Sequence, residues 1–374
     1  MLNGIKTGGV EVETVLGEVA HGGFVVARID GKVTFVTGGL PGERVRVEIT
    51  ERGSRFDRGR VSEVLEPHPE RVTPPCAVAE VCGGCDWQHA SAEFQLELKR
   101  RVVAEQLVRL AGLEWSGVVE QVLPTFGWRT RMRYSPGPGL LGKRSHDVVR
   151  LPAEGCLIAA GPVPDVPVER DLSVTDAASG RSVFADGRLV AGEAVVVERA
   201  MGREFRLAAN GFWQIHPRAA DTLAEAVLAQ LEVRAGENAV DLYCGAGLFA
   251  GALARQGALV LGVELSRRAV QFARRNVPEA HFVAANIDRF LSGLPARTDV
   301  VVLDPPRRGA GRKVVAAVVA MRPRAVSYVA CDPAAFARDL GYFAELGYAT
   351  TQVRAFDLFP QTHHVECVAR LAPG

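Results

Sequence analysis

Three side chains with reactive or ligand-binding groups stand where runs of apolar residues give way to loops. Glu264 ends the run LVLGVE, Asp304 ends VVVLD, and Cys331 ends SYVAC. A glycine-containing segment, residues 245–247, follows the run VDLYC in the same way. Because parallel α/β sheets bind ligands at the carboxyl ends of their strands, we expect all four positions to meet along one edge.

The glycine segment and the acids around it restrict the ligand. Gly245-x-Gly247-x-x-Ala250 fits a loose dinucleotide fingerprint, and Glu264, 17 residues after Gly247, is suited to both ribose hydroxyls of a nucleoside. Asp241 places a second acid before the glycines. A cationic sulfonium without phosphate suits these acids better than a pyrophosphate does, so the residues favour S-adenosylmethionine over NAD without excluding the latter.

The segment Asp304-Pro305-Pro306 predicts a rigid loop at the edge where the cofactor is expected. Arg307 and Arg308 follow it, and a pair of arginines beside such a crevice suits a phosphate-bearing substrate. The simpler alternative is a solvated pair of charges on a loop.

Cys331 precedes a helix expected to begin at Pro333, and a helix N-terminus lowers the pKa of a thiol toward neutrality. Methylation of nitrogen or oxygen needs no thiolate, but carbon 5 of a pyrimidine is a poor nucleophile. Addition of a thiolate to carbon 6 activates carbon 5, and a base must then remove the C5 proton. Glu366 is the candidate base, with His363 and His364 beside it.

The elements expected to position these groups change along the chain. Residues 10–65 contain short runs rich in Val, Thr and Phe separated by Gly or Pro, which predict a small β-barrel. An apolar stripe predicts a helix over 91–111. From about residue 206, strand-like and helix-like segments alternate, which predicts a parallel, doubly wound sheet.

Composition narrows the class of protein. The 374 residues suggest two or three domains, and the net charge of +1 excludes nucleic-acid binding driven by overall charge. The longest apolar run, 314–321, is far shorter than the ~20 residues of a membrane helix, and the N-terminal residues lack a signal peptide's apolar core. We therefore expect a cytoplasmic protein whose seven cysteines are reduced.

One segment departs from this neutral balance. Between Lys99 and Arg150, ten basic and four acidic residues give a net charge of +6. Arg129, Arg131 and Arg133 alternate, so a strand would present them on one face. Nearby aromatic side chains could stack on splayed RNA bases, and they are Phe126, Trp128 and Tyr134. The alternative is a solvated basic face over core aromatics.

Three cysteines have the close spacing of metal ligands, Cys76-x5-Cys82-x2-Cys85. A four-ligand site requires one more side chain, and either zinc or an iron–sulfur cluster fits the spacing. The candidates for the fourth ligand are His68, His89 and Cys156. Cys244 and Cys367 lack a comparable setting, and we expect them in the core.

The ordered motifs of the chain resemble those of the RNA uracil-5 methyltransferases. Residues 10–65 resemble the N-terminal TRAM barrel of that family, and FWQI, DLYCGAG, GVELS, AAN, LDPPRRG, YVACDP and FPQTHHVE resemble its successive methyltransferase motifs. The resemblance implies an RNA-binding, OB-like TRAM barrel over 1–68, a small α+β central domain with a metal cluster over 69–205, and a Rossmann-like methyltransferase domain over 206–374.

The resemblance also implies roles for individual residues. Cys331 corresponds to the nucleophile and Glu366 to the base that removes the C5 proton. Leu248 stands where the family often has Asn, and His216 replaces another common Asn. The residues that correspond to cofactor contacts are Gln214, Tyr243, Glu264, Asn286 and Asp304.

One branch of the family holds a [4Fe–4S] cluster, and the resemblance to it favours Cys156 as the fourth ligand beside Cys76, Cys82 and Cys85. Because that branch tends to modify large-subunit ribosomal RNA, we expect a monomeric enzyme that makes 5-methyluridine in 23S rRNA. Transfer RNA uridine and RNA cytosine are the alternative targets. A non-catalytic RNA-binding module is the alternative class, and the presence of both Cys331 and Glu366 opposes it.

Overall fold

The structure is a computed structural model that describes residues 11–137, 139–165 and 171–374. The first ten residues of the expected barrel domain, and residues 138 and 166–170 of the expected central domain, lie outside the described part of the chain.

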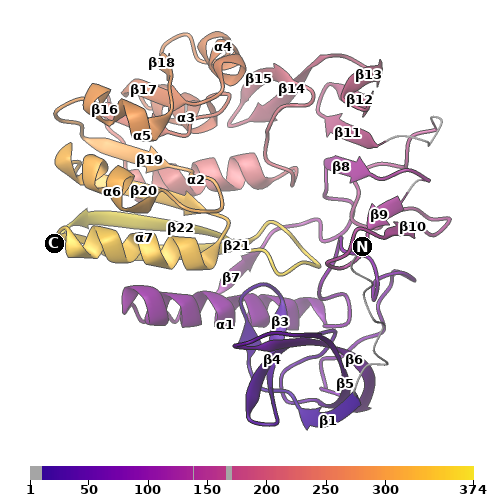
Figure 1. Cartoon of the computed structure of the whole chain (residues 1–374). Helices are drawn as coiled ribbons and strands as arrows, with labels where there is room; N and C mark the ends of the chain where they lie inside the picture. Colours follow the sequence, from indigo (N-terminus) through magenta and orange to yellow (C-terminus); the bar gives the residue numbers. More distant parts are fainter. Residues whose placement is uncertain (1–10, 138, 166–170) are drawn as a thin grey trace.

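The N-terminal region is a six-stranded barrel in which the strands follow the order β1-β5-β6-β4-β3-β2 (Figure 1). Apolar side chains alternate along the strands, so Val25, Val36, Val45 and Val47 fill the interior and polar residues face outward. Backbone hydrogen bonds between residues 17–18 and Val26 close the barrel. The strands are β1 (Glu11–Val15), β2 (Val19–Ala20), β3 (Phe24–Ile29), β4 (Lys32–Thr37), β5 (Arg44–Arg52) and β6 (Asp57–Glu66).

A long helix, α1 (Ala92–Ala111), follows the cysteine-rich segment. The Ser91 side chain accepts a hydrogen bond from the Phe94 amide at its start, and Gly112 ends it in the left-handed conformation. Its buried face includes Leu98 and Val102, as the apolar stripe predicts. This helix packs against α7 (Pro333–Glu345) of the C-terminal region.

Short antiparallel sheets form most of the region between α1 and residue 209 (Figure 1). One sheet has the order β13-β12-β11-β8, and two further pairs are β9 with β10 and β14 with β15. The strands are β8 (Arg131–Tyr134), β9 (Gly139–Leu141), β10 (Val148–Arg150), β11 (Leu172–Ala177), β12 (Gly180–Ala185), β13 (Arg188–Ala191), β14 (Val195–Ala200) and β15 (Arg203–Ala208).

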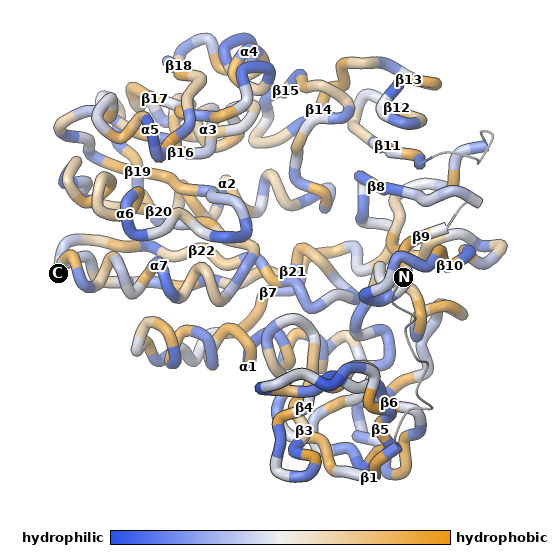
Figure 2. Tube along the Cα trace, in the orientation of Figure 1, coloured by the Kyte–Doolittle hydropathy of each residue, from blue (hydrophilic) through white to orange (hydrophobic). Residues whose placement is uncertain are grey.

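The C-terminal region is an eight-stranded sheet with the order β18-β17-β16-β19-β20-β22-β21-β7. Its central strands are buried on both faces, and Figure 2 shows these strands as more hydrophobic than the outer helix α4. The strands are β7 (Val119–Gln121), β16 (Asn238–Leu242), β17 (Leu259–Glu264), β18 (His281–Ala284), β19 (Val300–Leu303), β20 (Ala325–Ala330), β21 (Tyr348–Asp357) and β22 (Glu366–Pro373).

Helices cover both faces of this sheet. One apolar core lies under α2, α3 and α4, and a second lies under α1, α6 and α7. The remaining helices are α2 (Ala219–Leu231), α3 (Leu248–Arg255), α4 (Arg267–Asn276), α5 (Ile287–Phe290) and α6 (Gly311–Ala320), with a 3₁₀ turn at Leu291–Gly293. The predicted doubly wound architecture is therefore confirmed.

The sheet is not parallel throughout, because β22 runs antiparallel to both β20 and β21. The connection from β21 to β22 is only residues 358–365, whereas a parallel crossover needs about a dozen residues or more. In addition, β7 pairs with β21 although it falls within the expected central domain. The boundaries at residues 68 and 205 stay a prediction.

No helix in the described ranges is long and apolar enough to cross a membrane.

Candidate active site

The segment after β16 turns sharply at the carboxyl edge of the sheet. Tyr243, Gly245 and Gly247 all have positive φ angles, of 67°, 53° and 96°. A positive φ is unusual for tyrosine and marks a backbone held by its surroundings. A Cβ on Gly247 would lie 3.2 Å from Val277, so this glycine permits close packing, whereas a Cβ on Gly245 would meet no atom within 4 Å.

Two acids near the glycine segment, in the crevice at the carboxyl ends of β16, β17 and β19, accept hydrogen bonds from backbone amides. Glu264 accepts hydrogen bonds from Gly245 at 3.2 Å and from Ser266 at 2.7 Å, which ties the end of β17 to the glycine segment. The fully buried Asp241 accepts one from the Ala250 amide at 2.8 Å. The acid predicted to contact a ribose therefore lies beside the glycine segment.

The crevice also contains polar atoms without partners. Asp241 Oδ1 and Asn286 Oδ1 are buried and have no hydrogen-bond partner among the described residues. Such atoms are costly in a folded chain unless a ligand satisfies them. Together with open space at Gly245, they fit a nucleoside cofactor that supplies hydrogen-bond donors and a positive charge.

Gln214 lies in the segment between β15 and α2, half-buried and without a hydrogen bond to the described residues. In the same segment, Asn210 Oδ1 accepts a hydrogen bond from Arg268 Nη1 at 3.3 Å. Arg268 is near the start of α4, just after Glu264 and Ser266. The segment that carries Gln214 therefore borders the end of β17.

A pocket of about 200 Å³ lies next to this crevice. Arg307 and three histidines are among its lining residues, and the Arg307 guanidinium suits a phosphate or another anionic group. The lining residues are His21, Arg307, Cys331, Asp332, Pro333, His363 and His364.

Strand register brings the expected nucleophile and base together. Ala330 at the end of β20 pairs with Cys367 of β22 in antiparallel register, so Cys331 and Glu366 are the next residues of the two strands. Glu366 is buried, and its charge and that of Asp304 raise the pKa of the Cys331 thiol. The three groups predicted from separate motifs therefore lie in one electrostatic environment.

The expectation of a low thiol pKa is wrong for the chain without ligands. Burial first, and then Glu366, raises the pKa of Cys331 to about 12. The N-cap of α7 is Asp332, whose carboxylate accepts the Ala335 amide at 2.8 Å and adds another negative charge beside the thiol. Arg307 is the neighbour that lowers the pKa of Cys331. A helix N-terminus whose cap is an aspartate is thus a poor activator of a thiol.

The neighbouring carboxyls also resist ionisation. Burial raises the pKa of Asp304 to about 7. Burial and the charge of Asp304 raise the pKa of Glu366 well above its usual value, and Arg307 opposes this shift. Arg307 forms no ion pair with a carboxylate in the described part of the chain, and its Nη2 lies 3.4 Å from His364 Nε2. A positive charge without a carboxylate partner among the described residues therefore lines the pocket.

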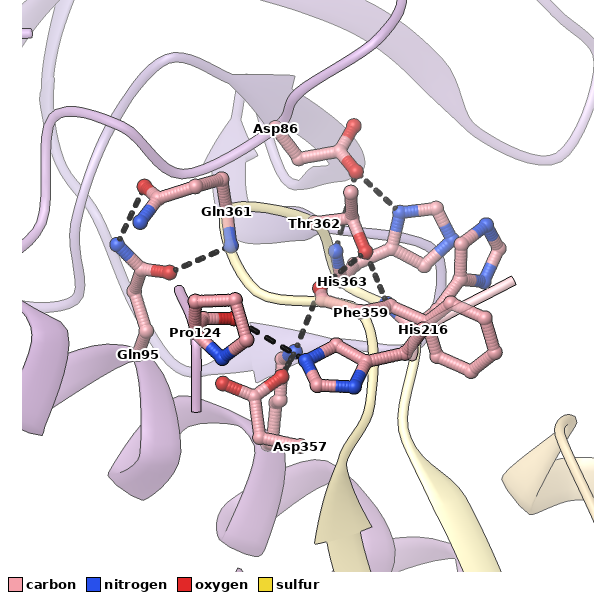
Figure 3. Close-up of polar contacts among 11 residues, drawn as sticks. Asp86, Gln95, Pro124, His216, Asp357, Phe359, Gln361, Thr362 and His363 are labelled. Atoms are coloured by element: carbon pink, nitrogen blue, oxygen red, sulfur yellow. Dashed lines mark hydrogen bonds and ion pairs between the residues drawn. The ribbon is translucent and has the colours of Figure 1, made fainter. Parts of the chain in front are cut away.

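The loop between β21 and β22, residues 358–365, is held by the cysteine-rich segment and by α1 (Figure 3). Asp86 Oδ2 contacts His363 Nδ1 at 2.6 Å and accepts the His363 amide at 3.1 Å. Gln95 Nε2 donates to Gln361 Oε1 at 3.1 Å, and the Gln361 amide donates to Gln95 Oε1 at 3.0 Å. No local pattern in the sequence indicates these contacts, because the paired residues lie more than 250 positions apart.

The four predicted cluster cysteines line one small cavity, although the segment that carries three of them has little regular structure. All four are free thiols, and the pKa values of Cys82, Cys85 and Cys156 are raised by burial and by charges within the group. The described residues nevertheless contain no group of three or more His, Cys, Asp or Glu side chains placed to hold a metal ion. The iron–sulfur assignment stays a prediction.

The alternative fourth ligands lie elsewhere. His68 stacks on Phe94, and His89 Nε2 lies 3.4 Å from the Gly39 carbonyl. Neither lines the cysteine cavity, whereas Cys156 does. Cys244 and Cys367 are buried in the two cores of the C-terminal region, as expected.

The interpretation of residues 99–150 as a basic face with stacking aromatics is wrong for several of its residues. Lys99 is fully buried, with its Nζ 2.6 Å from Asp357 Oδ1, and Arg131 pairs with Glu198 at 3.1 Å. Burial also removes two of the three aromatics from contact with RNA, and these are Trp128 and Tyr134. The excess positive charge is therefore partly structural.

Comparison with known proteins agrees with the fold. Residues 9–61 match the TRAM domain, residues 217–331 the methyltransferase small domain, and residues 295–372 the tRNA (uracil-5-)-methyltransferase family. A protein of Streptomyces avermitilis described as an uncharacterised RNA methyltransferase is 44% identical, over 98% of this chain and 99% of its own. The chain belongs to the RNA uracil-5 methyltransferase family. It is an S-adenosylmethionine-dependent RNA methyltransferase.

Other members of this methyltransferase family and its solved structures extend the match. A Corynebacterium efficiens protein described as an uncharacterised RNA methyltransferase is 35% identical, over 93% of this chain and 91% of its own. The crystal structure of Pyrococcus abyssi tRNA (uracil-54, C5)-methyltransferase with S-adenosyl-L-homocysteine has a TM-score of 0.72 at 24% identity. The match covers 96% of this chain and 99% of the Pyrococcus abyssi chain. The two proteins therefore have the same fold.

Proposed function

We propose that the enzyme transfers a methyl group from S-adenosylmethionine to carbon 5 of a uridine in RNA through a covalent adduct with Cys331. The observation that carries the proposal is the register of β20 and β22, which makes Cys331 and Glu366 neighbours across the two strands at the mouth of an acidic crevice. A methyltransferase acting on nitrogen or oxygen has no use for this pair.

Each residue has a defined task in this reaction. Arg307 stabilises the Cys331 thiolate, which adds to C6 of the uracil and makes C5 nucleophilic. The cofactor, when bound, supplies an electrophilic methyl group. Once C5 carries the methyl group, Glu366 removes the C5 proton, and the electrons of that bond re-form the C5–C6 double bond and expel the Cys331 thiolate. Glu366 must be ionised to accept this proton, and Arg307 is the neighbour that lowers its pKa.

We assign the cofactor to the crevice at the ends of β16, β17 and β19. The unpartnered Oδ1 atom of Asn286 suits a donor on the nucleoside, and Glu264 suits the ribose hydroxyls. Asp304 lies beside the end of β16, with its amide 3.3 Å from the Leu242 carbonyl, and its negative charge suits the sulfonium. The proposed contacts are Gln214, Tyr243, Glu264, Asn286 and Asp304.

We further propose a [4Fe–4S] cluster held by Cys76, Cys82, Cys85 and Cys156. The donor set supports it, because four reduced thiols border a cavity whose other walls are mainly apolar. The proposed target is a uridine of 23S rRNA, with the barrel contacting the RNA. The domain boundaries at 68 and 205, the monomeric state and the cytoplasmic location stay predictions from the sequence.

Two substitutions test the covalent mechanism. Cys331→Ala is expected to abolish methyl transfer while RNA binding remains, and Glu366→Gln is expected to trap a protein–RNA adduct that survives a denaturing gel. Methylation near the wild-type rate by Cys331→Ala contradicts the mechanism. Comparing the methylated uridines of rRNA and tRNA before and after gene removal identifies the target, and loss of a methyl group from tRNA alone contradicts the rRNA assignment.

A further inference from the structure

One wall of the reaction pocket comes from the N-terminal barrel. The turn between β2 and β3, residues 21–23, reaches the loop that follows β20, and His21 lines the same pocket as Cys331. His21 Nε2 lies 3.1 Å from Asp332 Oδ2, and the two side chains are 36% and 26% exposed. A residue more than 300 positions away in sequence therefore contacts the immediate neighbour of the nucleophile.

The same turn also contacts the loop that leads to Glu366. Gly23 has a φ of +80°, and a Cβ on it would lie 3.0 Å from His363 Cβ. The turn thus touches both loops that carry the reactive groups: Asp332 beside Cys331, and His363 three residues before Glu366. No side chain larger than hydrogen fits at this position without moving His363.

A third segment braces the turn. Arg144 donates a hydrogen bond from Nη2 to the Gly22 carbonyl at 3.2 Å, and its guanidinium lies 3.6 Å from the centre of the Phe24 ring. The preceding residue, Lys143, donates its amide to the Val81 carbonyl at 2.8 Å, within the cysteine-rich segment. The position of the turn is therefore set by contacts on three sides.

We infer that the β2–β3 turn is an integral wall of the reaction pocket, and that His21 is a positioning residue that holds Asp332 and thereby the loop of the nucleophile. The barrel then does more than contact RNA, because its placement decides whether the pocket around Cys331 is complete. This inference rests on the proposed function of Cys331.

Electrostatics gives a physical reason for the arrangement. The charge of Asp332 is one of the groups that raise the pKa of Cys331. Burial opposes ionisation of Asp332, but the hydrogen bond with His21 and those from backbone amides lower its pKa below the usual value. An Asp332 carboxylate paired with His21 opposes the neighbouring thiolate less than an unpaired one does.

The kinetic test compares His21→Ala with Arg28→Ala, which removes an exposed basic side chain from β3 of the same barrel. For His21→Ala we expect kcat to fall roughly tenfold while the Kd for RNA stays within about twofold, because a displaced nucleophile slows the reaction without weakening binding. Arg28→Ala is expected to leave kcat unchanged. A weaker Kd with unchanged kcat for His21→Ala identifies a simple RNA contact and overturns the inference.

Two further variants separate positioning from a folding defect. Asp332→Asn keeps a helix N-cap but removes the charge, so adding His21→Ala to it is expected to cause little further loss of kcat. Additive losses overturn the inferred pairing. Gly23→Ala leaves His21 in place but pushes the turn away from His363, and we expect it to lower kcat as His21→Ala does. A wild-type kcat for Gly23→Ala would contradict the inference that the turn is a wall of the reaction pocket.

A readout without catalysis distinguishes failure of this inference from failure of the proposed function. The rate of Cys331 alkylation by iodoacetamide, measured by peptide mass spectrometry, is expected to rise several-fold in Gly23→Ala, which changes access to the thiol without removing His21, but not in Arg28→Ala. Unchanged alkylation in Gly23→Ala overturns the wall even if the enzyme methylates uridine. Faster alkylation, in a protein that forms no adduct with RNA, supports the wall and rejects the covalent mechanism.

Discussion

Asp304 is a carboxyl that the folded chain makes difficult to ionise. Its pKa rises from 3.8 to about 7 because of burial alone. The nearby Asp241 and Glu366 have raised pKa values as well, with burial as the largest cause. A site that gathers acids in this way is suited to a positively charged ligand.

The raised pKa of Asp304 predicts how stability depends on pH. Between about pH 4 and pH 7 the folded chain keeps a proton on Asp304 that the unfolded chain has lost, so the free energy of unfolding falls as pH rises through this window. Asp304→Asn removes that penalty. We expect the variant without ligands to be more stable than wild type by about 2–4 kcal/mol at pH 8, with no gain at pH 4.

Urea unfolding at the two pH values measures this difference, and Asp288→Asn on the exposed start of α5 is the matched control. Equal stability gains at pH 4 and pH 8 would show that the effect does not arise from ionisation. We also expect Asp304→Asn to bind S-adenosylmethionine more weakly, as calorimetry can test, because the charge that destabilises the empty site is the one that faces the sulfonium.

Residue types alone could identify Cys331, Glu264 and Asp304 as candidate site residues, because each stands at the end of an apolar run that predicts a strand. They could not predict the thiol's pKa. That value depends first on burial and then on nearby charges, among them Glu366 at the start of β22 and Asp332 at the N-cap of α7. Interactions between charged residues of distant segments cannot be predicted from a local sequence pattern.

At the scale of elements, the loop between β21 and β22 is the part that depends most on distant support. It carries His363 and His364 and leads into Glu366, yet its own backbone supplies few of its contacts. Buried Gln95 on α1 forms two hydrogen bonds with Gln361, and Lys99 Nζ donates to the Phe359 carbonyl at 3.1 Å. The helix therefore acts as a rigid support for the catalytic loop.

Removing one support should loosen the loop more than it unfolds the protein. Gln95→Ala leaves the buried amide and side chain of Gln361 without their partner, at a cost of about 1–3 kcal/mol in the free energy of unfolding. We expect kcat to fall several-fold because the loop before Glu366 becomes mobile. The control is Glu93→Ala on the exposed face of α1, and equal kcat in the two variants would show that the loop needs no such support.

Periodicity could predict most elements of the catalytic sheet, including α1 with its Ser91 cap and α7 with its start at Pro333. It could not predict that β7 joins the far edge of that sheet, since three residues carry too little pattern. It also could not predict the reversed direction of β22, which follows from the length of the preceding loop. Pairing partners are a property of the folded chain.

At the scale of the whole molecule, three distant regions meet at one pocket. The barrel supplies His21 and the C-terminal region supplies Cys331, while the cysteine-rich segment contacts the lining residue His363 through Asp86. The net charge of +1 hides this concentration of basic and acidic groups, much of which holds the regions together. The architecture explains how a nearly neutral chain can still place a basic side chain, Arg307, in the pocket.

The cavity lined by the four cysteines is adjacent in sequence to a residue that holds the loop before Glu366, so we expect loss of a bound cluster to affect the active site. Cys85 directly precedes Asp86, whose amide donates to the Gln361 carbonyl at 2.9 Å and whose side chain holds His363. Protein purified without oxygen is expected to be brown, with about four irons per chain. Cys156→Ser, which alters the ligand farthest along the sequence, should lose most of this iron and its visible absorbance.

Loss of the cluster should then disturb the active site, because Asp86 would hold His363 less firmly. We expect Cys156→Ser to show faster proteolysis within residues 76–89 and a lower kcat, while the exposed control Glu154→Gln retains wild-type iron and activity. A colourless wild-type protein that contains zinc would replace the iron–sulfur assignment with a zinc site. Full iron content in Cys156→Ser would instead remove Cys156 from the ligand set and require a fourth ligand other than His68 or His89, which lie outside the cavity.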